Sequence, residues 1–204
     1  MITFDKVKTA YAAKGYKFYA EKAYQVNLFG IRNNALTVDE FNDVIGIAYL
    51  DEYLTPQCLP VRGTTKPGLY WLGKEHIGNS NGTAILIPGF YEKCWMLGKH
   101  KDEYEALVQS KAGVFKVWRD KDQDGSFDYS GTVYTDVAGL NRHTTSFNTN
   151  QQKVSAYSAG CQVIRDDKEH LIHLNICKRS VEYYPANLFS YALFLEEDFT
   201  GLSF

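Results

Sequence analysis

Short segments rich in apolar residues recur along this chain, with alternation of apolar and polar residues in 16–20 and 24–32, and this pattern predicts a fold built mainly from β-strands. The strand-like segments are 16–20, 24–32, 43–50, 68–72, 84–88, 91–97, 114–119, 132–135 and 191–195. Gly89 is expected to mark a turn between two of them. Strands and helices do not alternate regularly, so a parallel α/β sheet is not indicated.

Two segments instead have the apolar spacing of a helix. Thr3 can cap a short helix with Phe4 and Val7 on its apolar face, and Gly15 would end it. The second helix is expected over 167–179. Together with the strands, these helices predict a mainly β, α+β fold.

Composition is that of one globular unit. The chain has 204 residues, of which 45% are hydrophobic and 23% charged, and it has 15 Tyr and 12 Phe. The formal net charge of −2 gives no electrostatic footprint for nucleic acid. We interpret residues 1–22 as an N-terminal helical appendage and 23–204 as one catalytic domain.

The cysteines and the N-terminus bear on the compartment. Cys58, Cys94, Cys161 and Cys177 form no Cys-x-x-Cys pair, so zinc is not indicated and all four are expected to be reduced when synthesised. The first residues lack a basic region followed by an apolar core, and no segment approaches the ~20 apolar residues of a membrane span. We expect synthesis in the cytoplasm without a signal peptide.

The strongest chemical signal is a cysteine set in a small turn. Ser158 and Gly160 precede Cys161, so backbone N–H groups can lie open beside the sulfur and form an oxyanion hole. His143 could take the thiol proton, stabilise the thiolate and later protonate a leaving amine. An isolated Cys and His would more often be a buried thiol and a surface imidazole. The surrounding signature favours catalysis.

That signature resembles the active site of L,D-transpeptidases: a His, some fourteen to seventeen residues, and then Ser/Thr-x-Gly-Cys. Here His143 is followed by fourteen residues and by Ser158-Ala159-Gly160-Cys161. The segment 64–70, Thr-Thr-Lys-Pro-Gly-Leu-Tyr, is similar to the strand entry of that family. The order of motifs over about 26–195 is similar to a divergent branch found in bacteriophages and gut Bacteroidetes.

The resemblance implies a β-sandwich with a few short helices and an enzyme that acts on peptidoglycan stem peptides. Cys161 would attack an amide carbonyl next to a diamino acid and form a thioester, which water or an amine then resolves. Since no export signal is visible, we expect a phage-type lytic endopeptidase or carboxypeptidase. It would reach the cell wall in the periplasm through holin lesions or as a virion part. A cross-linking transpeptidase and a non-catalytic wall-binding or virion module remain alternatives.

Substrate contacts are less clearly marked. The family usually has an arginine after Gly-Cys-Ile, and Val163 stands there instead. Arg142 is therefore a candidate for the cationic contact, as are Arg32 and Arg62, each of which could equally be a surface arginine. His100, in Gly-Lys-His-Lys, is expected at the rim of the cleft or in a solvated loop.

Two further residues complete the predicted substrate site. Tyr157 and Gln162 flank the Ser-x-Gly-Cys turn and are included as substrate contacts.

On the second predicted helix, His170 and His173 have a metal-like spacing but no evident third ligand, so we expect exposed positions.

An acidic turn is the one candidate for a cofactor. Asp120, Asp122 and Asp124 occupy the first, third and fifth positions of a calcium-type loop, with Gly125 at the sixth. Gly131 stands at the twelfth, where a bidentate Glu is expected. A polar hairpin without metal is the alternative that we favour, because Asp and Gly are good turn formers. No other cofactor is indicated.

Overall fold

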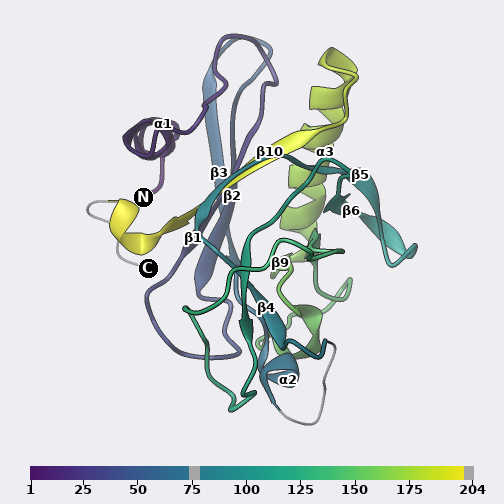
Figure 1. The fold of residues 1–204 in the computed structure, drawn as a ribbon. Helices are drawn as coiled ribbons and strands as arrows, with labels where there is room; N and C mark the ends of the chain where they lie inside the picture. The colour runs from purple at the N-terminus through teal and green to yellow at the C-terminus, as the bar shows by residue number, and fades with distance from the viewer. Residues whose placement is uncertain (74–78, 200–204) are drawn as a thin grey trace.

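The strands close into one barrel, with a small separate sheet beside it (Figure 1). The computed structural model describes residues 1–73 and 79–199. Hydrogen bonds link the barrel strands in the order β1-β10-β5-β6-β8-β9-β3-β2, and β4 pairs with β7. The strands are β1 Asn27–Arg32, β2 Asp43–Leu50, β3 Pro56–Thr64, β4 Thr83–Leu86, β5 Gly89–His100, β6 Tyr104–Gln109, β7 Val117–Asp120, β8 Arg142–Thr144, β9 Gln162–Ile164 and β10 Phe189–Leu195.

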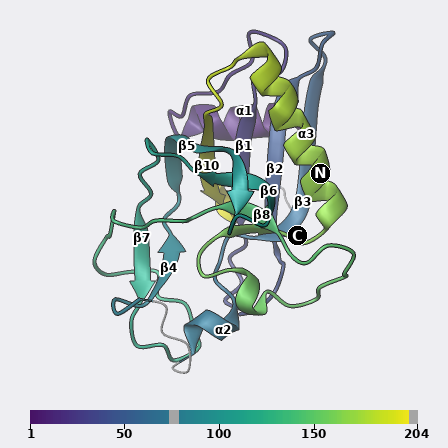
Figure 2. The same ribbon diagram turned by 90° about the vertical axis from the view of Figure 1, so that its right-hand side faces the viewer.

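The mainly β, α+β class is confirmed. The resemblance implied a sandwich, but the eight strands form one continuous closed order rather than two separate facing sheets. Two pairs in this order are parallel, β1 with β10 and β8 with β9. The β4–β7 sheet lies beside the barrel, at the same end as the short helix α2, Leu69–Leu72 (Figure 2).

The main core fills the barrel and fixes the approach to β8. Trp95 is fully buried and packs against Tyr191, with 4.5 Å between ring centroids. Its indole Nε1–H donates to the carbonyl of Leu140 at 2.8 Å. Because Leu140 lies just before β8, this hydrogen bond ties the start of that strand to the core.

Helix α1, Phe4–Ala13, begins where the sequence predicts. Thr3 Oγ1 accepts the N–H of Lys6 at 3.4 Å, and the helix packs in a second apolar cluster with Phe29 of β1. The hydroxyl of Tyr11 donates to the carbonyl of Leu28 at 2.8 Å. Figure 1 shows α1 on the opposite side of the barrel from α3. The boundary between appendage and domain stays a prediction.

Helix α3, Asp167–Tyr183, is longer than predicted and starts at the N-cap Asp166, whose side chain accepts two backbone N–H groups. The expectation that His170 and His173 are exposed was wrong. Both are buried, at 2% and 1% exposure, because the helix lies along the barrel with these residues inward. No helix among the described residues is long and apolar enough to cross a membrane.

Several strand predictions were wrong. Residues 16–20 have no regular structure, 68–72 include α2, and only an isolated bridge at Tyr134 forms in 132–135. Gly89 begins β5 instead of marking a turn. The strands β3, β6, β8 and β9 were not predicted. β8 contains His143, and β9 begins directly after Cys161.

Candidate active site

The two halves of the motif meet because β8 and β9 run parallel and side by side. Arg142 pairs with Gln162 and His143 with Val163. Residues on neighbouring strands that are paired point to the same side, and successive residues alternate. His143 and Cys161, the residue before β9, therefore share one face. A strand spacing of about 4.8 Å and an offset of two residues put their Cα atoms roughly 8 Å apart.

Cys161 lies at the edge of a small apolar cluster and is partly exposed. Its Sγ accepts the backbone N–H of Asn141 at 3.4 Å and faces the carbonyl of Gly139 at 3.5 Å. Burial raises the pKa of the thiol to about 11, while the Asn141 N–H and Lys101 act in the opposite direction. The resting side chain is therefore a thiol at neutral pH.

The turn before Cys161 is closed by Ser158. Its buried Oγ donates to the carbonyl of Cys161 at 2.8 Å and accepts the N–H of Gly160 at 3.2 Å. Gly160 has φ +118°, and a Cβ there would lie 2.6 Å from the carbonyl oxygen of Ala84, so glycine is required. Among the described residues no acceptor binds the N–H of Cys161, which is therefore the donor left for an oxyanion.

His143 is held in one orientation by its Nδ1 atom. Nδ1 lies 2.7 Å from the carbonyl of Thr144 and 3.1 Å from the hydroxyl of Tyr104. Tyr104 donates to the same carbonyl at 3.0 Å. A carbonyl only accepts, so Nδ1 carries the proton and Nε2 has the lone pair. This is the tautomer that a general base needs.

Nε2 of His143 is buried and has no hydrogen-bond partner within the described part of the chain. The ring is 2% exposed. Burial, and next the neighbouring His100, lower the pKa of His143 to about 3. The imidazole is therefore neutral at pH 7, and no hydrogen bond to Cys161 forms in this arrangement.

His100 belongs to the same site. It ends β5, pairs with Tyr104 across the hairpin and is buried, so the solvated-loop alternative was wrong. Its ring stacks on His143 with centroids 3.9 Å apart, and its Nδ1 lies 3.1 Å from Nδ2 of Asn141. The Asn141 amide donates here, because its Oδ1 accepts the N–H of Gln109 at 2.9 Å.

Two of the predicted substrate contacts point elsewhere. Arg142 and Gln162 lie on the opposite face of β8 and β9, with exposures of 2% and 0%. The Arg142 guanidinium contacts Nδ1 of His173, and Gln162 Oε1 accepts the hydroxyl of Tyr191 at 2.8 Å. Both side chains are therefore part of the interior and do not reach the Cys161 face.

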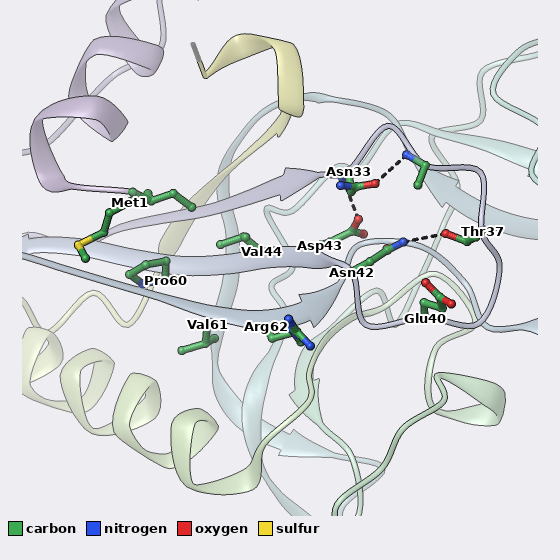
Figure 3. A pocket seen from close by; sticks show the side chains of 12 residues that line it. Met1, Asn33, Thr37, Glu40, Asn42, Asp43, Val44, Pro60, Val61 and Arg62 are labelled. Carbon is green, nitrogen blue, oxygen red and sulfur yellow. Dashed lines mark hydrogen bonds between the residues drawn. The ribbon is translucent and has the colours of Figure 1, made fainter. Parts of the chain in front are cut away.

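The remaining predicted substrate contacts lie in different parts of the structure. Tyr157 packs in the cluster of Cys161, and its hydroxyl pairs with Ser146 at 2.6 Å. Arg32 is buried and bonds to the side chain and carbonyl of Thr65. Arg62 lies on the cavity shown in Figure 3. Tyr157 is therefore the predicted contact that lies beside the cysteine, whereas His100 lies against His143.

One cavity, of about 590 Å³, does not include Cys161 among its lining residues. Met1, Asn33 and Asp43 are among the residues that line it (Figure 3). A cavity of about 430 Å³ is bounded instead by Ala159 of the cysteine turn and by Trp71. The contact with the turn makes the smaller cavity the better candidate for substrate, despite its size.

The acidic turn has a different geometry from the predicted loop. Carboxylate oxygens of Asp120, Asp122 and Asp128 lie within 4.8 Å of one another. Asp124 points to Ser126, accepting its N–H at 2.9 Å and its hydroxyl at 2.6 Å. The predicted set is therefore corrected, with Asp128 in place of Asp124.

The residues that the sequence did not single out are Tyr104, Asn141 and Thr144. Asn141 could have been found, because it stands two residues before His143 and shares its face of the strand. Thr144 acts through its backbone, and Tyr104 comes from another hairpin, so neither has a local signal in the sequence.

Searches against protein-family models, curated proteins and solved structures gave no match. The resemblance to L,D-transpeptidases therefore rests on the sequence motif alone.

Proposed function

We propose that this protein is a cysteine-dependent peptidoglycan stem-peptide hydrolase of the L,D-transpeptidase type, acting as a phage-type lytic enzyme. The observation that carries the proposal is the orientation of His143. Its Nδ1 proton is held by the Thr144 carbonyl, and its free Nε2 is on the same face as the Cys161 thiol. A base oriented by a third group beside a nucleophile is the recurring arrangement of acyl-transfer sites.

In the first half-reaction, Nε2 of His143 takes the proton from Sγ as Sγ bonds to the amide carbonyl carbon. The oxygen becomes an oxyanion beside the N–H of Cys161. The carbon–nitrogen bond then breaks, the amine leaves with the proton from His143, and a thioester remains. In the second half-reaction His143 deprotonates a water, and the water oxygen bonds to the thioester carbonyl carbon. The carbon–sulfur bond then breaks, the acid is released, and the proton returns from His143 to Sγ.

The pKa values constrain the timing of the first proton transfer. The pKa of Cys161 is raised to about 11 and that of His143 lowered to about 3, both mainly by burial. A standing thiolate–imidazolium pair is therefore disfavoured, contrary to the expectation from the sequence. Proton transfer must accompany attack, after the side chains have closed to hydrogen-bonding distance. Catalytic hydrogen bonds are often long before substrate binds.

The reaction is tested on purified muropeptides with tripeptide and tetrapeptide stems, with product masses as the readout. We expect products heavier by one water in total, formed by the wild type and lost in Cys161→Ala. Cys58→Ala is the matched control, because Cys58 is a half-buried thiol on β3, outside the site. A Cys161→Ala variant that retains turnover would remove the proposal.

The same assay separates hydrolysis from cross-linking. A free D-amino acid added in excess competes with water for the thioester. Incorporation of its mass in place of water would favour the transpeptidase alternative. Intact muropeptides, together with a folded wild-type chain that still binds the wall polymer, would favour the non-catalytic module.

A further inference from the structure

A group of three carboxylates gathers at the end of β7. Asp120 is the last residue of that strand, and Asp122 and Asp128 follow in the turn. One oxygen from each lies within 4.8 Å of the others. Three negative charges at this separation repel one another, so the turn needs something to offset them.

Asp120 is the observation that goes beyond an acidic cluster. Its side chain is fully buried, at 0% exposure, and neither carboxylate oxygen has a hydrogen-bond partner of good geometry among the described residues. Buried carboxylates are otherwise hydrogen-bonded, ion-paired or bound to a metal.

The turn itself brings the third carboxylate into place. Gln123 and Gly125 have φ values of +52° and +89°, so the chain reverses sharply between them. Asp124 is turned towards Ser126, and the reversal carries Asp128 back to Asp120. The ligands are thus at the first, third and ninth positions of the turn.

We propose that Asp120, Asp122 and Asp128 bind one calcium ion. Two oxygens on the same Ca²⁺ can be at most about 5.2 Å apart, twice a Ca–O distance of about 2.6 Å, and the three carboxylates meet this limit without rearrangement. The donors are all oxygen, which suits a hard cation and not zinc. Backbone carbonyls and water would complete the shell. Mg²⁺ fits less well, because it demands regular octahedral geometry.

The ion would hold the small sheet against the cysteine turn. Asp120 pairs with Thr83 of β4, and the next residue, Ala84, is the one that Gly160 packs against. Calcium bound at Asp120 therefore stabilises the edge on which the turn before Cys161 rests. Binding itself is independent of catalysis and can be measured without substrate.

The test uses the full chain after removal of metal with a chelator. Calcium is titrated calorimetrically, and terbium is used as a luminescent substitute excited through Trp118 and Tyr129, which neighbour the ligands in sequence. We expect one site per chain. At a calcium concentration 100-fold above Kd, the melting temperature should rise by about 5–10 °C. No binding at millimolar calcium, or an equal shift with magnesium, would overturn the proposal.

Variants make the assignment specific. Asp120→Asn should abolish binding and the calcium-induced shift, yet melt no lower than the wild type in chelator, because it removes an unpaired buried charge. Asp124→Asn is the matched control in the same turn and should keep both. If Asp120→Asn does not fold, Asp128→Asn, whose side chain is less buried, takes its place. Binding lost in Asp124→Asn and kept in Asp128→Asn would refute this ligand set.

Discussion

The pH dependence of Cys161 alkylation tests whether Cys161 and His143 are both neutral at rest. A thiol with a pKa of about 11 is about 10⁻⁴ thiolate at pH 7, against about 3% for a free thiol with a pKa of about 8.5. The roughly 300-fold deficit is partly offset, about 10- to 20-fold, because a more basic thiolate is more nucleophilic. We therefore expect alkylation at pH 7 about 20- to 30-fold slower than that of a free thiol.

The assay is iodoacetamide labelling from pH 6 to 10.5, with peptide mass mapping to follow each cysteine separately. The Cys161 rate should rise about tenfold per pH unit with no plateau below pH 10. Cys58 is an internal reference, because burial alone also raises its pKa to about 11. Circular dichroism at each pH checks that the fold persists.

The perturbation is His143→Ala. If His143 is neutral, its removal takes away no positive charge, and the cavity it leaves admits water to the thiol. The alkylation midpoint of Cys161 should stay or fall, while that of Cys58 does not change. A wild-type midpoint below pH 8.5 that rises in His143→Ala would instead demonstrate a thiolate–imidazolium pair, and the reasoning from burial would be refuted.

Three other variants test the surroundings of the site. Gly160→Ala should lower the free energy of unfolding by about 1–3 kcal/mol or more in urea titrations. The reasons are the φ of +118° at Gly160 and the close Ala84 carbonyl. Unchanged stability would contradict this geometry. Arg142→Met should leave KM for muropeptides unchanged and alter the free energy of unfolding little. The buried guanidinium contacts the neutral His173, and an apolar side chain of similar volume often replaces such a charge. A large rise in KM would restore the substrate role of Arg142. His170→Gln should flatten the loss of stability in acid. Burial lowers the folded-state pKa of His170 to about 4, so the unfolded chain alone binds this proton between about pH 6.5 and 4, and the wild type loses up to about 3 kcal/mol as pH falls through that window. Equal pH profiles of wild type and variant would count against this assignment.

Strands with a continuous apolar run were the predictable part of the fold. Residues 43–50 match β2 from end to end, because most of that strand is buried and apolar. β3 was missed since it contains Pro56 and Pro60 and is only half-buried, features that argue against a strand in sequence. It forms because β2 offers a partner along its whole length. β8 and β9 have three residues each, too few for any period to appear.

In the site, the motif picks out Cys161 and His143 as the proposed nucleophile and base, but it does not specify their environment. The side on which Arg142 points does follow from sequence once 142–144 is taken as a strand, since a neighbour of His143 must face the other way. Without that strand, a cation beside the histidine looked like a substrate contact. The stacking of His100 on His143 depends on the β5–β6 hairpin, whose pairing no local pattern specifies.

Asn141 explains how so short a strand as β8 can hold His143 and Cys161 in fixed positions. Its N–H binds Cys161 Sγ, and its carbonyl accepts the N–H of Gln162, which locks β8 to β9 at the residue where the thiol emerges. Its side chain reaches in the other direction, to His100 and to Gln109 of β6. Asn141 therefore connects Cys161 to the β5–β6 hairpin, which places His100 against His143. Each of these polar groups would be left without a hydrogen-bond partner if its contact were lost. Removing one contact therefore also weakens the others. The position of Cys161 relative to His143 is thus set by the backbone pairing and the Asn141 contacts together, and not by any direct bond between the two side chains.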